Sequence, residues 1–330
     1  MTSEDALELP PATLFRCPPC LALPTADPHA LAVECMLRFV GAHYVKRDAP
    51  LPVALEVAAS SGSSKMVRYS GLASCLQSIE NSTRLDAEAL SHEQRTLSLC
   101  VKALVENELL PAFVYITHSD TPLFKNAIRK GVVPKVATAW QRLRGTYRCG
   151  VLEKSACCGR YSNLEEALER MESGLRALET LHVANAKAAG NFLLGTERPC
   201  GADALAYAAA SSFLHADFVS NCASGAVVRA QRRVKEECPA LLEYVERLRL
   251  LYFEEYSGFY TLRATGGPDA TAADPKHAMD ETFRQGRWAV LAWTAGFAAV
   301  YFVLTNAELI LALLSEFDGE EMLEEEEEQH

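Results

Sequence analysis

Short apolar runs and one amphipathic stretch alternate near the start of the chain. Three of the apolar runs have the length and composition of strands: Cys20–Leu23, residues 51–57 and residues 65–69. Asp27 followed by Pro28 predicts a helix after the first run, because Asp caps free amides and Pro fits the first helical turn. With a second helix at 71–80, this order predicts a small α/β domain over residues 20–82, preceded by an N-terminal extension at 1–19.

Beyond residue 82 the apolar positions follow a helical period alone. One stripe recurs every three or four residues: Leu164, Leu168, Met171, Leu175, Leu178 and Leu181. Two helix starts have the spacing at which a hydroxyl and a long polar side chain cap each other's amides: Ser91 with Gln94, and Ser162 with Glu165. Pro239 begins the last helix of this part. We therefore expect an all-helical domain over residues 83–262.

The longest uncharged stretch of the chain is Trp288–Ala307. Its roughly 20 residues would form about 30 Å of helix, which matches the hydrocarbon core of a bilayer. Trp288 and Trp293 suit the headgroup level, so we predict a transmembrane anchor over residues 287–314. The helix either stops there or continues with Glu308 against a partner. The alternative is a buried core helix of a soluble domain.

Charges differ on the two sides of this stretch. Arg284 and Arg287 precede it, whereas Glu316–Glu328 is strongly acidic. Because Lys and Arg favour the cytoplasmic side, we expect a cytosolic body and an acidic tail, residues 315–330, across the membrane. A linker rich in Gly, Pro and Ala is expected at 263–286. The tail is expected to be solvated, with docking to basic partners as the alternative.

The chain of 330 residues, 49% of them hydrophobic, has the composition of a folded protein of about two domains. Its net charge is −11 at pH 7, but ten acidic residues and no Lys or Arg lie from Trp288 onward. The rest of the chain is therefore nearly neutral, and nucleic acid is not an expected partner. Residues 1–9 show neither a secretory signal nor an Arg-rich transit pattern.

Several residue runs resemble the metaxins, in the same order along the chain. They cover the first strand-to-helix passage, an acidic Leu-Leu-Pro turn, a glycine turn, an Asp-containing helix and the last helix: Leu23–Asp27, Leu31–Leu37, Val105–Pro111, Phe192–Gly195, Gly201–Tyr207 and Leu248–Phe253. Each run is short, and together they extend over roughly Leu23 to Tyr260. The resemblance implies an α/β plus all-α, glutathione-transferase-like fold, with a thioredoxin-like N-terminal domain, a helical C-terminal domain and one C-terminal transmembrane helix.

The resemblance also implies a function without catalysis. Metaxins are non-enzymatic subunits of the mitochondrial outer-membrane sorting and assembly complex, which aids import and insertion of β-barrel precursors. The expected partners are the β-barrel assembly protein, a second metaxin-like subunit and the precursors, with the body cytosolic and the tail in the intermembrane space. Two alternatives stay open: a membrane-anchored glutathione transferase-like enzyme, and a tail-anchored organelle tethering or fission factor.

Within the resemblance, Cys200 and Asp203 form a structural helix cap. The transferase-like fold usually has Ser or Thr three residues before this Asp, and here Cys200 stands in that place. Since a thiol accepts hydrogen bonds weakly, we expect Asp203 to satisfy more of the first helical amides alone. Replacing Asp203 by Ala is then expected to cost on the order of 1 kcal/mol or more.

Glutathione chemistry needs a hydroxyl or thiol at the start of the first helix and a cis-proline loop. Thr25 is the only hydroxyl near that start, and no Pro directly precedes the strand expected at Met66–Tyr69. Ser70 and Gly71 partly match the loop that holds the γ-glutamyl group, or they simply cap a helix. We therefore expect no catalytic residue and no cofactor.

The cysteines are expected to be reduced and to pack as small apolar side chains. Cys17 and Cys20 have the spacing of a redox pair, but a Pro-stiffened approach to the first strand is the simpler interpretation. Cys157 and Cys158 are adjacent and the histidines lack metal spacing, so no metal site is expected. A basic helical face for anionic lipid or an acidic partner loop, or else an ordinary solvated face, is expected from four cations: Arg229, Arg232, Arg233 and Lys235.

Overall fold

The computed structural model describes residues 10–58, 66–155, 157, 159–185 and 192–253. The chain divides into a unit up to Thr265 and a unit from Gly266, and every described residue belongs to the first. The expected linker, the anchor with Trp288 and Trp293, and the acidic tail lie outside the described residues. Among the described helices, none combines the length and the hydropathy of a membrane span.

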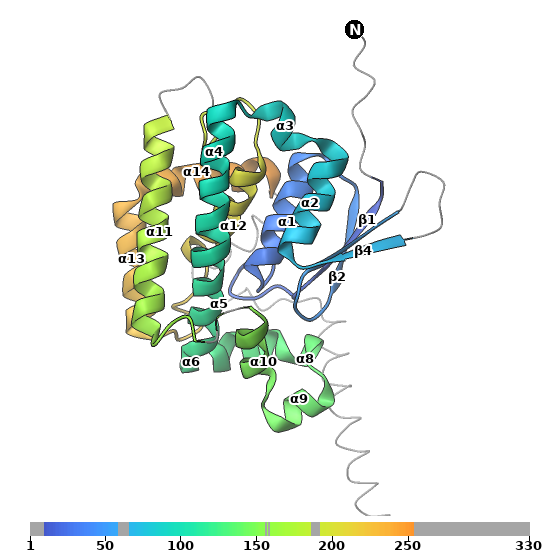
Figure 1. Cartoon of the computed structure of the whole chain (residues 1–330). Coiled ribbons are helices and arrows are strands. Elements are labelled where there is room, and N and C mark those ends of the chain that lie inside the picture. The colour runs from blue at the N-terminus through green and yellow to red at the C-terminus, as the bar shows by residue number, and fades with distance from the viewer. Residues whose placement is uncertain (1–9, 59–65, 156, 158, 186–191, 254–330) are drawn as a thin grey trace, which may run out of the picture. The chain divides into compact units, whose positions relative to one another are not determined.

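Four strands form one mixed sheet in the order β2-β1-β3-β4 (Figure 1). In chain order they are β1 (Ala12–Arg16), β2 (Tyr44–Asp48), β3 (Ala54–Ala58) and β4 (Met66–Ser70). β1 runs parallel to β2 and antiparallel to β3, and β3 and β4 are antiparallel to each other. In the two central strands Leu14 pairs with Leu55, and both side chains are fully buried. The sheet core therefore lies between β1 and β3.

Helices α1 (Pro28–Phe39) and α2 (Leu72–Thr83) pack against each other and against the sheet. The parallel pairing of β1 and β2 requires a crossover, which α1 provides. α1 is buried on almost all sides, because it also packs against α12 (Gly201–Leu214). Asp27 caps α1, which confirms the predicted helix start.

The strand predictions are confirmed in two places and wrong in one. Strands β3 and β4 confirm the second and third predicted runs. Cys20–Leu23 makes only an isolated bridge, because Leu21 and Ala22 have left-handed backbones, with φ of 57° and 60°, that turn the chain. The first strand is instead β1, within the stretch expected as an N-terminal extension. β2 escaped the pattern because it is a largely exposed edge strand rich in charge.

The described elements after α2 are all helices. In chain order they are α3 (Leu85–Ala89), α4 (His92–Leu104), η1 (Val105–Leu109), α5 (Leu110–Ser119), α6 (Thr121–Leu123), η2 (Phe124–Ile128), α7 (Arg129–Gly131), α8 (Val133–Val136), α9 (Ala139–Arg144), α10 (Tyr147–Lys154), α11 (Leu164–Asn185), α12, α13 (Gly225–Glu237) and α14 (Pro239–Tyr252). The elements named η are π-helical turns.

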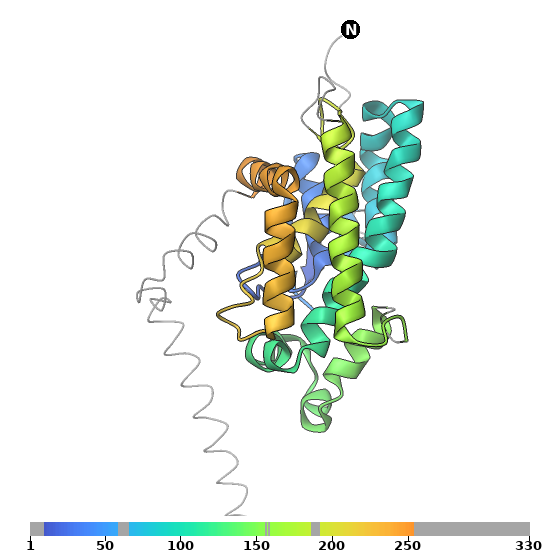
Figure 2. The same cartoon turned by 90° about the vertical axis from the view of Figure 1, so that its left-hand side faces the viewer.

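Helix α12 is the centre of this helical part, since every one of its residues is buried. It packs against α1, α4, α13 and α14. α4, η1 and α5 follow one another without a break, and Pro111 near the start of α5 removes one backbone donor after the π-helical turn. α11 approaches these continuous helices closely at Gly174, where an added Cβ would lie 2.4 Å from a Leu109 methyl carbon. In Figures 1 and 2, α11 and α13 run side by side.

The predicted helix caps have mixed outcomes. The capping box of Ser91 with Gln94 is confirmed at the start of α4, and Pro239 begins α14 as predicted. The box of Ser162 with Glu165 is wrong, because Glu166 accepts the bonds of Ser162 instead. The apolar stripe of α11 is confirmed as core at its central positions: Leu168, Met171, Leu175 and Leu178.

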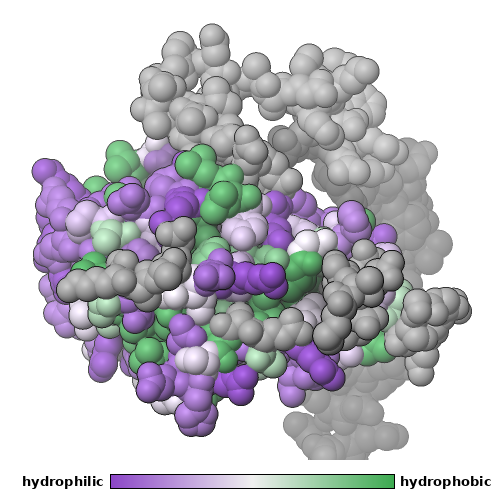
Figure 3. Space-filling model, turned by 90° about the horizontal axis from the view of Figure 1, so that it is seen from above, coloured by the Kyte–Doolittle hydropathy of each residue, from purple (hydrophilic) through white to green (hydrophobic). Residues whose placement is uncertain are grey.

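The surface of the described residues is mixed in hydropathy. Figure 3 shows the face at the top of Figure 1, where hydrophilic residues predominate and hydrophobic residues gather in several smaller groups among them. Single exposed apolar side chains are ordinary on a folded protein, so this face alone indicates no function.

Candidate functional site

A cavity of about 330 Å³ lies where the sheet and the helices after it come together. It is lined by the start of α1, the loop before β3, the start of α2, η1 and the residues around the end of α10. Glutathione chemistry would use the starts of α1 and α2, although the sequence predicts no cofactor. The charged or titratable residues of the lining are Asp27, His29, Glu106, Lys154 and Arg160.

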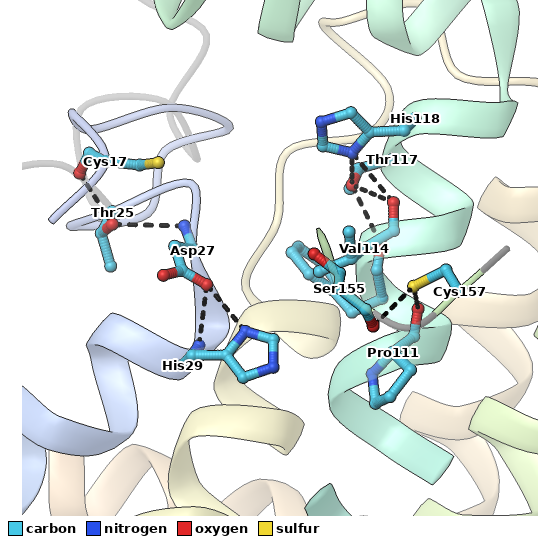
Figure 4. Close-up of polar contacts among 11 residues, drawn as sticks. Cys17, Thr25, Asp27, His29, Pro111, Val114, Thr117, His118, Ser155 and Cys157 are labelled. Atoms are coloured by element: carbon cyan, nitrogen blue, oxygen red, sulfur yellow. Dashed lines mark hydrogen bonds and ion pairs between the residues drawn. The ribbon is translucent and has the colours of Figure 1, made fainter. Parts of the chain in front are cut away.

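Asp27 is the deeply buried acid of this lining, with 2% of its surface exposed. Its Oδ1 accepts hydrogen bonds from the His29 amide at 3.1 Å and from His29 Nδ1 at 2.9 Å (Figure 4). Its Oδ2 is buried and has no hydrogen-bond partner among the described residues. Since an unsatisfied buried oxygen is costly, a donor on a bound ligand would be favourable here.

Thr25 is the hydroxyl expected near the start of α1, and it is buried away from the lining of the cavity. Its hydroxyl donates to the Cys17 carbonyl at 2.8 Å and accepts from the Asp27 amide at 3.2 Å (Figure 4). Both bonds hold the loop between β1 and α1 in place. The hydroxyl is therefore used by the protein backbone on both sides.

Cys17 and Cys20 follow β1 directly, so their interpretation as an approach to the first strand is wrong. Cys17 is buried, and burial followed by the charges of Asp27 and Asp48 raises the pKa of its thiol well above the usual value. α1 begins only at Pro28, so its amides do not lie next to Cys17 in the chain. These conditions disfavour the thiolate, which is the reactive form of a cysteine.

Helix α2 begins at the cavity without a side-chain cap. Gly71 is the N-cap residue, with φ of 87°, and its amide donates to the Val53 carbonyl at 2.8 Å. The interpretation of Ser70 as a simple cap is therefore wrong. Leu72 and Ala73 line the cavity and precede the first helical hydrogen bond, from the Cys75 amide to Gly71. Amides at this position favour an anionic group of a ligand.

Both signs of charge border the cavity. Lys154 and Arg160 are exposed cations, and Glu106 is a partly buried acid whose pKa burial raises. Asp27 adds a second carboxylate. The lining could therefore hold a small ligand that carries both an ammonium and a carboxylate group.

The peptide bond between Leu51 and Pro52 is cis, so the expectation that the chain lacks a cis-proline loop is wrong. The cis-proline loop precedes β3, whereas the sequence analysis concerned the strand expected at Met66–Tyr69, which is β4 in the structure. Leu51, Pro52 and Val53 all line the cavity. A sequence does not specify which X-Pro bond is cis, because that choice depends on tertiary contacts.

A second set of buried polar groups lies on α5 and after α10 (Figure 4). His118 Nδ1 donates to the Val114 carbonyl at 2.9 Å, and burial lowers the pKa of His118 to about 4. The Cys157 thiol donates to the carbonyl of Pro111 at 3.2 Å and to that of Ser155 at 3.3 Å. His118 is thus neutral at pH 7, and its Nδ1 and the Cys157 thiol bond to the protein itself.

Asp203 lies in the first turn of α12, away from this cavity. Its Oδ2 accepts from the Cys200 amide at 2.8 Å and the Cys200 thiol at 3.0 Å. Its Oδ1 accepts from the Leu193 amide at 2.8 Å and the Tyr244 hydroxyl at 2.6 Å. Burial raises the pKa of Asp203 against the opposing effect of these donors. The Cys200 thiol therefore donates to Asp203, a role that the sequence alone did not indicate.

The four cations of the expected basic face lie on α13 and are exposed. Arg232 pairs with Glu236 at 2.8 Å, and Arg233 pairs with Glu172 at 2.5 Å. The charges of Arg232 and Arg233, two of the four, are therefore balanced by acids within the protein. In the part of the chain that is described, no cluster of three or more His, Cys, Asp or Glu side chains is arranged for a metal ion.

No family model and no curated protein matches the chain. Solved structures that resemble it include a Ceriporiopsis subvermispora glutathione S-transferase in complex with glutathione, at 14% identity and TM-score 0.46, over 74% of this chain and 97% of that one. Another is Trametes versicolor glutathione transferase Omega 2S with 2,4-dihydroxybenzophenone, at 15% identity and TM-score 0.45, over 78% and 96%. A third is maleylacetoacetate isomerase from Anaeromyxobacter dehalogenans with bound GSH, at 17% identity and TM-score 0.41, over 80% and 99%.

At these low scores, we base the fold class on the elements of this chain itself. The sheet order β2-β1-β3-β4, with its parallel β1-β2 crossover through α1, is thioredoxin-like, and only helices follow α2. The described residues therefore have a glutathione-transferase-like fold with a helical majority.

Proposed function

We propose that the chain is a metaxin-like, non-enzymatic subunit of the mitochondrial outer-membrane sorting and assembly complex, and that its transferase-like body is a docking domain. The observation that carries this proposal is the environment of Thr25. Its hydroxyl is bound by the Cys17 carbonyl and the Asp27 amide, so it is not offered to a thiol in the cavity. If the Thr25 hydroxyl does not activate a thiol, a body of this fold acts by binding partners through its surface.

Cys17, a second nucleophile close to the start of α1 in the chain, supports the same proposal. The pKa of the Cys17 thiol is raised well above its usual value, first by burial and then by the charge of Asp27. A protonated, buried thiol neither attacks an electrophile nor exchanges with a disulfide at a useful rate. We therefore propose that recognition, and not catalysis, is the work of this body.

The predicted anchor at 287–314 places this body at a membrane, where it would meet a β-barrel assembly protein, a second metaxin-like subunit and β-barrel precursors. Solubilising mitochondria in mild detergent and purifying the tagged full chain tests this. We expect an outer-membrane barrel subunit to copurify with the full chain. Recovery of the chain without any outer-membrane barrel subunit would contradict the proposal.

Alkaline carbonate extraction tests the anchor separately. The full chain should stay in the membrane pellet, and a chain that ends at residue 286 should move to the supernatant. Tagged localisation of the same two forms distinguishes the import subunit from the tethering factor, since a tether would also mark the membrane of a second organelle. Release of the intact full chain by carbonate would contradict a transmembrane anchor.

A membrane-anchored, glutathione-dependent enzyme is the second candidate, and the cavity is the observation that favours it. The starts of α1 and α2, together with Lys154 and Arg160, offer contacts to both charged ends of a small peptide. Retention of the full chain on immobilised glutathione, and its release by free glutathione, measures this binding. Binding without turnover would leave the docking proposal standing, with glutathione as a ligand only.

A further inference from the structure

One segment of the helical part carries positive charge alone. Residues 121–152 contain seven Lys or Arg residues and no Asp or Glu. Six of the seven are exposed: Lys125, Arg129, Lys130, Lys135, Arg142 and Arg144. None of these six forms an ion pair with a carboxylate of the described residues. They differ in this respect from Arg232 and Arg233 of α13, whose charges are balanced by neighbouring acids.

Two large apolar side chains project from the middle of this basic segment. Trp140 is 57% exposed and Leu143 is 79% exposed, and both belong to α9. Because they are three residues apart in a helix, they lie on the same face. The Arg144 guanidinium lies 4.0 Å from the centre of the Trp140 ring. An exposed Trp and Leu on one helical face, flanked along the chain by cations without a carboxylate partner, are unusual for a surface that faces only water.

The helix that presents these side chains is well defined at both ends. Thr138 and Gln141 form a capping box at its start, and Gly145 ends it with φ of 66°. α8, α9 and α10 form the lower end of the described ribbon in Figure 1, and the same green segment is lowest in Figure 2. We call Lys135–Arg144 the α9 tip. It is a projecting end of the body that a flat surface can reach.

We infer that the α9 tip binds an anionic membrane surface. In this arrangement Trp140 lies at headgroup level, Leu143 enters the boundary of the acyl chains, and Lys135, Arg142 and Arg144 contact lipid phosphates. An acidic protein would pair with the cations. It would offer Trp140 and Leu143 no apolar layer comparable to the acyl chains of a membrane. The inference goes beyond the docking function proposed above and does not depend on membership of an import complex.

The test uses the full chain with Trp288→Phe and Trp293→Phe, which leaves Trp140 as its single tryptophan. The protein is reconstituted in vesicles of phosphatidylcholine alone, or of phosphatidylcholine with phosphatidylserine, both containing lipid brominated on the acyl chains. We expect Trp140 fluorescence to be quenched more strongly in the anionic vesicles. High salt should remove this difference, because it screens the attraction between the cations and the lipid.

Charge reversal identifies the surface responsible. Arg142→Glu combined with Arg144→Glu should lower the anion-dependent quenching about tenfold or more, since it replaces two attractions with two repulsions. Arg229→Glu combined with Arg232→Glu on α13 changes the net charge equally and should leave the quenching unchanged. Circular dichroism checks that both variants are folded.

Two results would overturn the inference. One is equal quenching of Trp140 in neutral and anionic vesicles. The other is an equal loss of quenching in the α9 and α13 variants, which would indicate a general effect of net charge. Failure of the membrane anchor is a different result, seen as release by carbonate, and is distinguishable from both.

Discussion

The Tyr244 hydroxyl donates a 2.6 Å hydrogen bond to Oδ1 of Asp203, and this bond joins α14 to the first turn of α12. The same carboxylate accepts from the Leu193 amide and from the amide and thiol of Cys200. Asp203 and Tyr244 are both fully buried. Asp203 thus links three segments of the helical core through one side chain. Since the site is buried, water cannot replace these contacts.

Replacing Asp203 by Ala should therefore reduce the free energy of unfolding by about 3 kcal/mol or more, because several buried donors lose their acceptor together. Tyr244→Phe removes one donor and leaves the other bonds, so it should cost about 1 kcal/mol. Urea denaturation of the two variants measures both values. An Asp203→Ala variant no less stable than Tyr244→Phe would show that the network is not central to stability.

Glu34 on α1 is a buried carboxylate among cations. It lies 3.0 Å from Arg38, 3.6 Å from Lys46 and 3.9 Å from Arg16. Arg16 is itself buried, so Glu34→Ala should destabilise the protein by about 3 to 5 kcal/mol by leaving that cation without its carboxylate. The measurement is the shift in the urea midpoint, with an unchanged slope.

Glu56→Ala is the matched control for this prediction. Glu56 pairs with Arg68 at 3.2 Å on the surface of the sheet, where solvent weakens the attraction. Its removal should cost less than about 1 kcal/mol. Equal effects of Glu34→Ala and Glu56→Ala would contradict a structural role for the buried cluster.

His118 should make the stability of the protein depend on pH in the acid range. Burial lowers its pKa from 6.5 to about 4, so between these values the unfolded chain binds a proton that the native chain does not. Stability should therefore decrease as pH falls from about 6.5 to about 4, with this residue contributing about 3 kcal/mol of the decrease. His118→Gln should reduce the difference in unfolding free energy between pH 7 and pH 4 by that amount. The exposed His92→Gln should leave the difference unchanged, and the same response in both variants would rule out this explanation.

The cysteines should differ in the reactivity of their thiols according to their surroundings. Cys100, Cys149 and Cys222 are exposed, whereas Cys17 is buried with a raised pKa. Iodoacetamide at pH 7 should alkylate the three exposed thiols more than about ten times faster than Cys17 in the native full chain. Peptide mass spectrometry reads out each site, and unfolding in urea should equalise the rates. Labelling of native Cys17 as fast as Cys149 would show that the Cys17 thiol is accessible and activated, against this prediction.

Local signals in the sequence predicted the helices well. Asp27 with Pro28 marks the start of α1, and Ser91 with Gln94 marks the start of α4, because each cap is complete within a few residues. Strands were less predictable. β2 exposes most of its side chains at the sheet edge, and the apolar residues from Cys20 to Leu23 belong to a turn instead.

The cavity could not be predicted because its residues are distant in sequence. Asp27 was recognised as a cap, but nothing local indicates that Glu106, Lys154 and Arg160 line the same space. The acceptor of the Thr25 hydroxyl and the four donors to Asp203 likewise depend on tertiary contacts. The charge run of 121–152 is visible in the sequence, but its exposure beside Trp140 is a property of the fold.

The chain has a transferase-like fold, and we propose that it uses this fold without thiol chemistry. The most direct measurement is the rate at which the purified full chain, in mild detergent, conjugates glutathione to chlorodinitrobenzene. We predict a rate equal to that of the reaction without protein, because the Thr25 hydroxyl is held by the backbone and the Cys17 thiol is buried. Turnover that saturates with glutathione and falls in Thr25→Val would contradict the proposal.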